Sequence, residues 1–291
     1  MSKRRNRPPA TPKREKVRDI FVGRPFEGLA DETEWIALRE LVPAASAPLR
    51  LKPEITAEYG DRPVTLSTVL PMAWPAMIRQ DGRVFVGLQR HVQSGDVSRD
   101  LAVAILRALQ TEPGDTVSVP ALPGQGPRLQ DILDDGPLDI TMHEGFEYRL
   151  DAVQAEDPNV KASLERANSS IYPTVRMSAA HAAYWCRVPD KAHVRWVLPD
   201  EEDPALDALA RLAATGDLVL GDDTKFAGMF RAHGLLVPVW DVPCEPEGAD
   251  WESPLADFAK RYRDILGETG PLDAAARRAK QGLVGRQLTL R

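Results

Sequence analysis

Two hairpin signals, far apart in the sequence, constrain the fold of this chain more than any other feature. Residues 76–80 and 83–88 are rich in apolar residues on either side of Asp81 and Gly82, a pair that supplies the positive φ angles of a two-residue type I′ turn. Residues 184–188 and 193–198 form a second such pair around a turn at 189–192. Hairpins build antiparallel sheets, so we predict an α+β protein with mostly antiparallel sheets and packed helices.

The turns also predict the strand registers. A two-residue turn at 81–82 places Ile78 opposite Phe85. The second hairpin places Trp185 opposite Trp196, which is a favourable cross-strand aromatic pair.

Helices and further strands are predicted from caps and from apolar periodicity. Asp31 followed by Glu34 resembles a capping box at the start of a helix that Pro43 ends, and Ser98 is the expected N-cap of a buried helix over 99–110. Further strands are predicted at 49–52, 116–119, 147–150 and 235–240. Further helices are predicted at 159–167, from 203, at 226–231, after Pro254 and at 273–280.

The predicted elements repeat once along the chain. Each half contains a strand, a hairpin, a helix and a closing strand, which indicates two similar halves and an internal duplication, although a chance likeness of element order explains the pattern too. We therefore predict a disordered basic tail over 1–19, an N-terminal half over 20–130 and a C-terminal half over 131–252, with C-terminal helices and a basic tail over 253–291.

Charge is distributed unevenly along a chain whose net charge is −6. Residues 1–18 carry eight basic side chains and one acid, so the remainder of the chain is acidic. The start of the chain lacks the apolar run of a signal peptide, no segment reaches the ~18 apolar residues of a membrane helix, and there are two cysteines. We predict a cytoplasmic protein.

The basic tail is the first candidate binding segment. It would contact the phosphates of nucleic acid or of the ribosome, or an acidic protein surface, or it would only solubilise the chain. No aromatic residue lies among its basic residues, so any contact with nucleic acid should be electrostatic and independent of base sequence. Its candidate residues are Lys3, Arg4, Arg5, Arg7, Lys13, Arg14, Lys16 and Arg18.

A second candidate surface is the segment 24–28, with Arg24, Phe26 and Glu27 as its contact residues. The alternative, which we favour, is a structural turn in which Phe26 fills the core and a charged neighbour caps an adjacent element.

Motifs for common chemistries do not occur in the sequence. There is no P-loop, no complete dinucleotide fingerprint and no Gly-x-Ser-x-Gly elbow, and His143-Glu144 lacks the second histidine of a zinc protease. We predict no cofactor and no metal site. The predicted register places Cys186 opposite Arg195 and on the same sheet face as His193, so a small Cys-His enzyme is the alternative. A structural cysteine is the default, because no third orienting group is visible.

Residues 24–28 (Arg-Pro-Phe-Glu-Gly) and 35–40 (Trp-Ile-Ala-Leu-Arg-Glu) resemble an actinobacterial family of unknown function, and the resemblance extends over nearly the whole chain. Members of that family sometimes carry names borrowed from preprotein translocase or topoisomerase, but the motifs of neither are present here. Residues 209–243 are similar to half of the bacterial family named for enhanced serine sensitivity, which implies a fold more than an activity. We therefore expect a non-enzymatic binding or regulatory protein, with a purely protein–protein adaptor as a further alternative.

Overall fold

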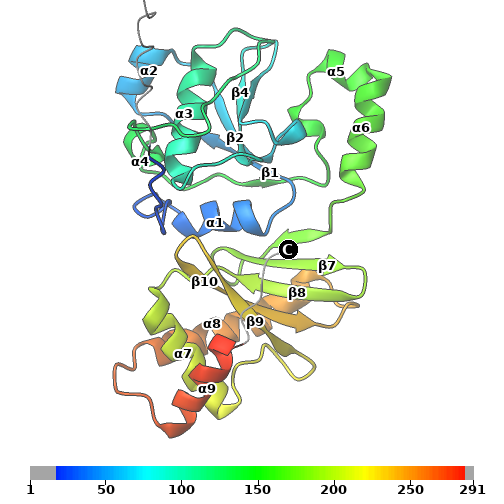
Figure 1. Cartoon of the computed structure of the whole chain (residues 1–291). Coiled ribbons are helices and arrows are strands. Elements are labelled where there is room, and N and C mark those ends of the chain that lie inside the picture. Colours follow the sequence, from blue (N-terminus) through cyan, green and yellow to red (C-terminus); the bar gives the residue numbers. More distant parts are fainter. Residues whose placement is uncertain (1–17, 286–291) are drawn as a thin grey trace, which may run out of the picture.

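The chain folds into two five-stranded β-sheets with helices packed against them, as a computed structural model that describes residues 18–285 shows (Figure 1). All strand pairs except one are antiparallel. The predicted α+β class with mostly antiparallel sheets is confirmed. None of the helices within this range is both long and apolar enough to cross a membrane.

The first sheet has the strand order β3-β4-β2-β1-β5. Its β2–β4 pair is parallel, since the chain returns through the short 3-10 helix η1 (Pro71–Ala73) and β3 before it enters β4. The helices α2 (Pro53–Tyr59), α3 (Val97–Leu109) and α4 (Leu129–Ile132) belong to this half. The strands are β1 (Ala45–Leu49), β2 (Val64–Val69), β3 (Ala76–Ile78), β4 (Val84–Gln89) and β5 (Thr141–Met142).

The second sheet has the order β6-β7-β8-β10-β9 and is antiparallel throughout. One of its faces is covered by α7 (Glu202–Thr215), η3 (Gly248–Trp251), α8 (Glu252–Leu266) and α9 (Ala274–Gly285), which share a core with it. The strands are β6 (Thr174–Arg176), β7 (Ala183–Val188), β8 (Lys191–Trp196), β9 (Lys225–Ala232) and β10 (Leu235–Val242).

Helix α1 (Glu32–Glu40) lies between the two sheets (Figure 1). The residues 33–38 are all buried, which is the pattern of a helix covered on every side. The core around it takes Val86 and Leu88 from the first sheet and Val237 and Val239 from the second. The two sheets therefore share one apolar core through α1, while the second sheet has a core of its own on its other face.

The predicted capping box of α1 is wrong. Asp31 has a left-handed backbone conformation and its side chain accepts a hydrogen bond from Leu138 N at 2.8 Å instead of capping the helix. Glu34 is completely buried and faces the second sheet, where it accepts hydrogen bonds from Tyr184 Oη at 2.6 Å and Arg176 Nε at 3.0 Å. Because the Glu34 carboxylate accepts these hydrogen bonds from the second sheet, it does not cap its own helix.

The two hairpins form, but with registers other than the predicted ones. In the first, Ile78 pairs with Val84, so the loop has three residues, because only Gly82 adopts a positive φ and a type I′ turn needs two. In the second, Cys186 pairs with His193 and Trp185 with Val194, because residues 189–190 alone make the turn. The predicted Trp185–Trp196 pair does not form.

Several smaller predictions are also wrong. The predicted helix at 226–231 is the strand β9, the predicted strand at 147–150 is the 3-10 helix η2 (Glu147–Arg149), and 116–119 is irregular. The segment 49–52 mostly follows β1 and forms only a single bridge to Leu133. Asp96 rather than Ser98 caps α3, since Ser98 is buried and bonds to Gln130 and Leu129. The remaining predicted helices and the strand near 235–240 are present.

Both sheets contain a hairpin followed by a helix, namely β3–β4–α3 and β7–β8–α7. However, β4 continues the sheet through a parallel partner and β8 through an antiparallel one. The internal duplication and the boundaries at 130 and 252 stay predictions.

Candidate functional site

The basic tail contributes little to the described part of the chain. Arg18 is exposed and lines a small pocket of about 60 Å³. The other predicted contact residues of the tail lie outside the described residues: Lys3, Arg4, Arg5, Arg7, Lys13, Arg14 and Lys16.

The segment 24–28 is engaged within the protein itself. Phe26 is fully buried, with its ring stacked on Trp35 at 5.8 Å between centroids. Arg24 donates two hydrogen bonds to Glu32, at 2.7 and 2.9 Å, and pairs with Glu201. This geometry agrees with the structural turn of the sequence analysis. Of the predicted contact residues in this segment, only Glu27 has a mostly exposed side chain.

Cys186 and His193 are cross-strand neighbours on β7 and β8, and the next strand of the sheet places Asp241 opposite His193. Nδ1 of His193 lies 3.0 Å from Asp241 Oδ1, so a third group exists that the sequence did not reveal. Burial raises the pKa of the Cys186 thiol, and Arg195 offsets only part of that rise. No hydrogen bond joins the thiol to the His193 ring in the described structure. The group of Cys186, His193 and Asp241 therefore lacks an activated nucleophile.

The first sheet has a polar face opposite α1 and α3. There Ser46 Oγ lies 2.7 Å from His143 Nε2, and the His143 ring stacks on Tyr148 at 3.9 Å between centroids. Tyr148 is in turn 2.5 Å from Ser67 Oγ. Burial lowers the pKa of His143. Within residues 18–285 no carboxylate orients this ring, so the pair lacks the third member of a Ser-His-acid triad.

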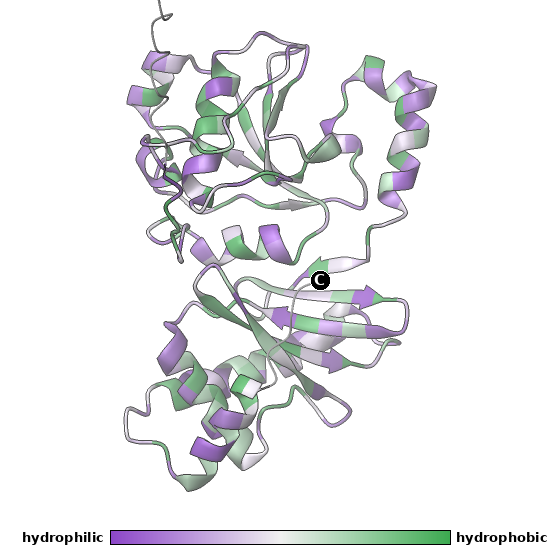
Figure 2. Ribbon diagram, viewed as in Figure 1, coloured by the Kyte–Doolittle hydropathy of each residue, from purple (hydrophilic) through white to green (hydrophobic). Residues whose placement is uncertain are grey.

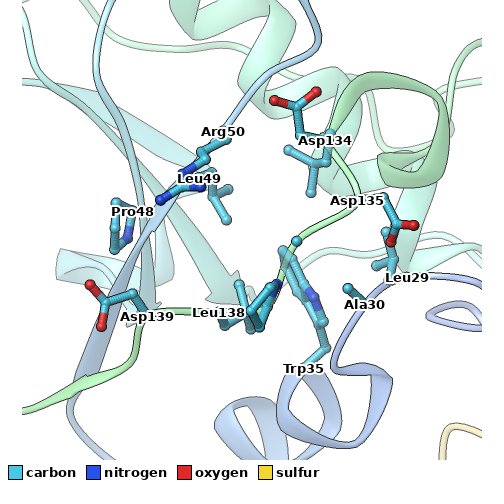
Figure 3. A pocket seen from close by; sticks show the side chains of 13 residues that line it. Leu29, Ala30, Trp35, Pro48, Leu49, Arg50, Asp134, Asp135, Leu138 and Asp139 are labelled. Carbon is cyan, nitrogen blue, oxygen red and sulfur yellow. The ribbon is translucent and has the colours of Figure 1, made fainter.

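One pocket of about 350 Å³ opens beside the start of α1 (Figure 3). Trp35 stands at its centre, and exposed charged side chains from two neighbouring segments, Arg50 with Asp134, Asp135 and Asp139, surround it. Among the residues that the structure describes, no three His, Cys, Asp or Glu side chains are grouped to hold a metal ion. The pocket is polar and open, and its carboxylates are exposed to solvent.

A larger groove of about 560 Å³ lies between η1 and the helical arm formed by α5 (Ala152–Glu156) and α6 (Pro158–Asn168). This volume falls within the range of small-molecule sites. Met72 and Trp74 form one wall, and both are among the most exposed large apolar side chains of the described structure. The floor includes Phe146 and Arg149.

The arm supplies the opposite wall. It has no buried residue, and hydrophilic positions dominate α6 (Figure 2). The residues of α6 that line the groove form a mostly apolar stripe at helical spacing: Val160, Ser163, Leu164 and Ala167. The arm thus turns its apolar side toward the groove without filling it.

The wall at η1 is held in an unusual backbone conformation. Met72 and Ala73 both have positive φ, at 52° and 49°, which costs a residue with a side chain about 1–3 kcal/mol. The residue of β4 that lies behind this turn is Gly87, where an added Cβ would lie 2.6 Å from Trp74 O. Glycine is therefore required for η1 to lie this close to β4, and the turn directs Met72 outward into the groove.

Arg149 is the one buried cation at the floor, with 5% of its surface exposed. Nη1 donates to Val69 O at 2.6 Å and Nε to Phe146 O at 3.3 Å, while the guanidinium lies 4.3 Å from the Phe146 ring centre. Burial lowers the pKa of Arg149, which nevertheless stays charged at neutral pH.

A family model matches residues 25–291 of the chain, and its description is a family of unknown function, DUF5926. The chain belongs to the DUF5926 family. No curated protein and no solved structure matches it significantly. The predicted likeness to a family of unknown function is confirmed in this coarse form. The signature at 24–28, the actinobacterial distribution and the likeness of 209–243 to the serine-sensitivity family stay predictions.

Sequence reasoning missed the groove of this DUF5926 protein. Its residues come from four separate segments. The buried arginine of η2, Arg149, lies in the segment 147–150 that was predicted to be a strand. One signal was available: Pro71-Met72-Ala73-Trp74-Pro75 places two large apolar side chains between two prolines, which is unusual for a strand.

Proposed function

We propose that this DUF5926 protein is a non-enzymatic binding protein of the cytoplasm and that the groove between η1 and α6 is its ligand site. The observation that carries the proposal is an open groove of about 560 Å³ whose wall exposes Met72 and Trp74. Apolar surface at a concave site, with a few polar groups, is typical of small-molecule sites. Two free cysteines, Cys186 and Cys244, support a reducing compartment.

Binding is favoured over catalysis because the two nucleophile candidates lie away from the groove. Neither Cys186 nor Ser46 is among its lining residues. The enzyme that would use Cys186 with His193, and the adaptor with no small ligand, are the competing functions.

The six tryptophans provide a direct assay. Trp74 has 43% of its surface exposed, whereas the other five are each less than 9% exposed. A neutral apolar probe such as dodecanol should therefore protect Trp74 from acrylamide quenching as it binds. The protection should disappear in Trp74→Phe and weaken in Met72→Glu. Val284→Glu, at an exposed apolar position on α9, is the matched control and should bind like the parent.

The basic tail is a separate part of the proposed function. The eight basic side chains of residues 1–18 support an electrostatic contact with nucleic acid or the ribosome, or with an acidic protein surface. Binding of a single-stranded RNA should weaken with salt by roughly −0.7 in log–log slope per phosphate contacted, and deletion of residues 1–18 should abolish it. Binding that survives the deletion would place the contact in the folded body.

A further inference from the structure

Arg149 differs from the other deeply buried arginines of the described chain. The side chains of Arg39 and Arg90 are 9% and 6% exposed, and each has an acidic partner, Glu40 at 3.3 Å and Asp100 at 3.2 Å. Arg149 has no carboxylate within 4.0 Å among residues 18–285. A buried charge without a paired counter-charge destabilises the folded protein, so the burial of Arg149 requires a reason.

The donors of Arg149 are only partly used. A guanidinium has five N–H groups, and the two backbone carbonyls of Val69 and Phe146 accept from Nη1 and Nε. Nη2 has no hydrogen-bond acceptor in the described structure. Because Arg149 lines the groove, this end of its fork is the part that a ligand can reach.

No acidic side chain lines the groove around Arg149, although the carboxylate of Glu147 on the same 3-10 helix is close enough to favour its charged form. The other polar side chains of the lining are His91, Gln154 and Ser163. Glu147, the acidic neighbour of Arg149 in η2, is exposed and accepts a hydrogen bond from Asn168 at 2.6 Å. The site therefore combines apolar walls with a cation at the floor and has no anion in its lining.

We propose that Arg149 anchors the anionic end of the groove's ligand, and that this ligand is a small amphipathic carboxylate. Its carbon chain would lie between Met72 and Leu164, and its carboxylate would accept a hydrogen bond from Arg149 Nη2. The planar fork of arginine matches a carboxylate, and a charge-assisted bond is about twice as strong as a neutral one. This inference rests on the proposed function, because it specifies the ligand of the same groove.

The expected selectivity follows from the strength of that bond. A hydrogen bond between charged groups contributes 1.5–3 kcal/mol, which corresponds to about 10- to 100-fold in affinity. A neutral ligand of the same length would gain the apolar contacts but leave Nη2 desolvated. We therefore expect dodecanoate to bind about 10- to 100-fold more tightly than dodecanol.

The experiment measures dodecanoate, dodecanol and dodecyl phosphate by calorimetry and by Trp74 quenching on the full chain. Arg149→Met should remove the preference for dodecanoate over dodecanol, and Arg149→Lys should keep part of it. Ser163→Glu, at an exposed position on the groove wall, places a carboxylate there and should weaken dodecanoate but not dodecanol. It tests the anchor even where a change at Arg149 prevents folding. Arg166→Met, an exposed arginine on α6 outside the groove lining, is the matched control.

Each outcome decides a different claim. Equal affinities for dodecanoate and dodecanol, unaffected by Ser163→Glu, would refute the anion anchor and leave the binding groove standing. Tighter binding of dodecyl phosphate would replace carboxylate by phosphate as the ligand class. Failure of every probe to bind or to protect Trp74 would refute both the anchor and the proposed function.

Discussion

The buried carboxylate of Glu34 should be a main determinant of how firmly α1 is held to the second sheet. Its side chain is 0% exposed, and it accepts hydrogen bonds from Tyr184 Oη at 2.6 Å and from Arg176 Nε at 3.0 Å, with Arg176 Nη2 at an ion-pair distance of 2.8 Å. Tyr184→Phe removes one hydrogen bond to a charged group, so we expect it to lower the free energy of unfolding by about 2 kcal/mol.

Glu34→Gln keeps the volume but removes the charge from all three contacts. Breaking a buried ion pair costs 3–5 kcal/mol, and the 35% exposure of the Arg176 side chain places this case at the lower end. We therefore expect a loss of about 3 kcal/mol. Because Tyr184 acts through the same carboxylate, the double variant should lose about 1–2 kcal/mol less than the sum of the single variants.

Urea unfolding of the four proteins, followed by tryptophan fluorescence and circular dichroism, measures these quantities at constant m-value. Glu54→Gln, an exposed change on α2, is the control and should stay within about 0.5 kcal/mol of the parent. Additivity of the two changes within about 0.5 kcal/mol would refute the coupling, and a near-neutral Glu34→Gln would refute the role of the buried carboxylate.

Two further predictions concern residues singled out in the sequence. Phe26→Ala should lower the free energy of unfolding by about 3–5 kcal/mol in the same assay, because Phe26 is fully buried against Trp35. Phe21→Ala, at an 83% exposed position, is the control and should change the free energy of unfolding little. Equal effects of the two changes would contradict the structural role of Phe26. Burial raises the pKa of Cys186, so less of its thiolate is present at any given pH. Iodoacetamide at pH 8 should therefore label Cys244 well before Cys186, and labelling of Cys186 should increase only at higher pH or on unfolding. A faster reaction at Cys186 than at Cys244 would favour the enzyme alternative.

The sequence predicts the fold class and most helices because these depend on local signals. Apolar periodicity identifies α3, α7 and α8, and both hairpins form in the predicted segments, although with other turn residues and registers. Burial between two sheets is not a local property. The capping box at Asp31 fails for this reason, since Glu34 accepts hydrogen bonds from Tyr184 and Arg176, which lie 150 and 142 residues further along the chain.

The strand β9 shows the same limit in another form. The segment 226–231 has no regular alternation, so its strand character depends on its pairing with β10. Its turn is His233-Gly234, where both residues have positive φ, at 48° and 91°, as a type I′ turn requires. The usual signals of such a turn are Asn-Gly, Asp-Gly and Gly-Gly, so the His-Gly pair did not identify this hairpin in advance.

The candidate site was beyond sequence reasoning for a physical reason as well. Arg149 can be recognised as an anchor only after its neighbours are known to include no carboxylate, and those neighbours come from η1, η2 and the α5–α6 arm. The candidates chosen from local motifs, Phe26 and Arg24, prove to have internal partners.

The first hairpin offers a test that separates the predicted turn from the observed one. In the structure, Gly82 N donates to Arg79 O at 2.9 Å and Arg79 N to Arg83 O at 2.9 Å, so Gln80 occupies the second position of a four-residue turn, where proline is favoured.

Gln80→Pro should therefore leave the free energy of unfolding within about 1 kcal/mol of the parent, since no backbone hydrogen bond from Gln80 N exists among the described residues. Gly82→Ala should lower it by about 1–2 kcal/mol, because only Gly82 has a positive φ. In the two-residue turn, Gln80 N would donate to the opposite strand, and proline there would remove a ladder hydrogen bond. A loss above about 2 kcal/mol in Gln80→Pro would therefore refute the three-residue loop and restore the register in which Ile78 faces Phe85.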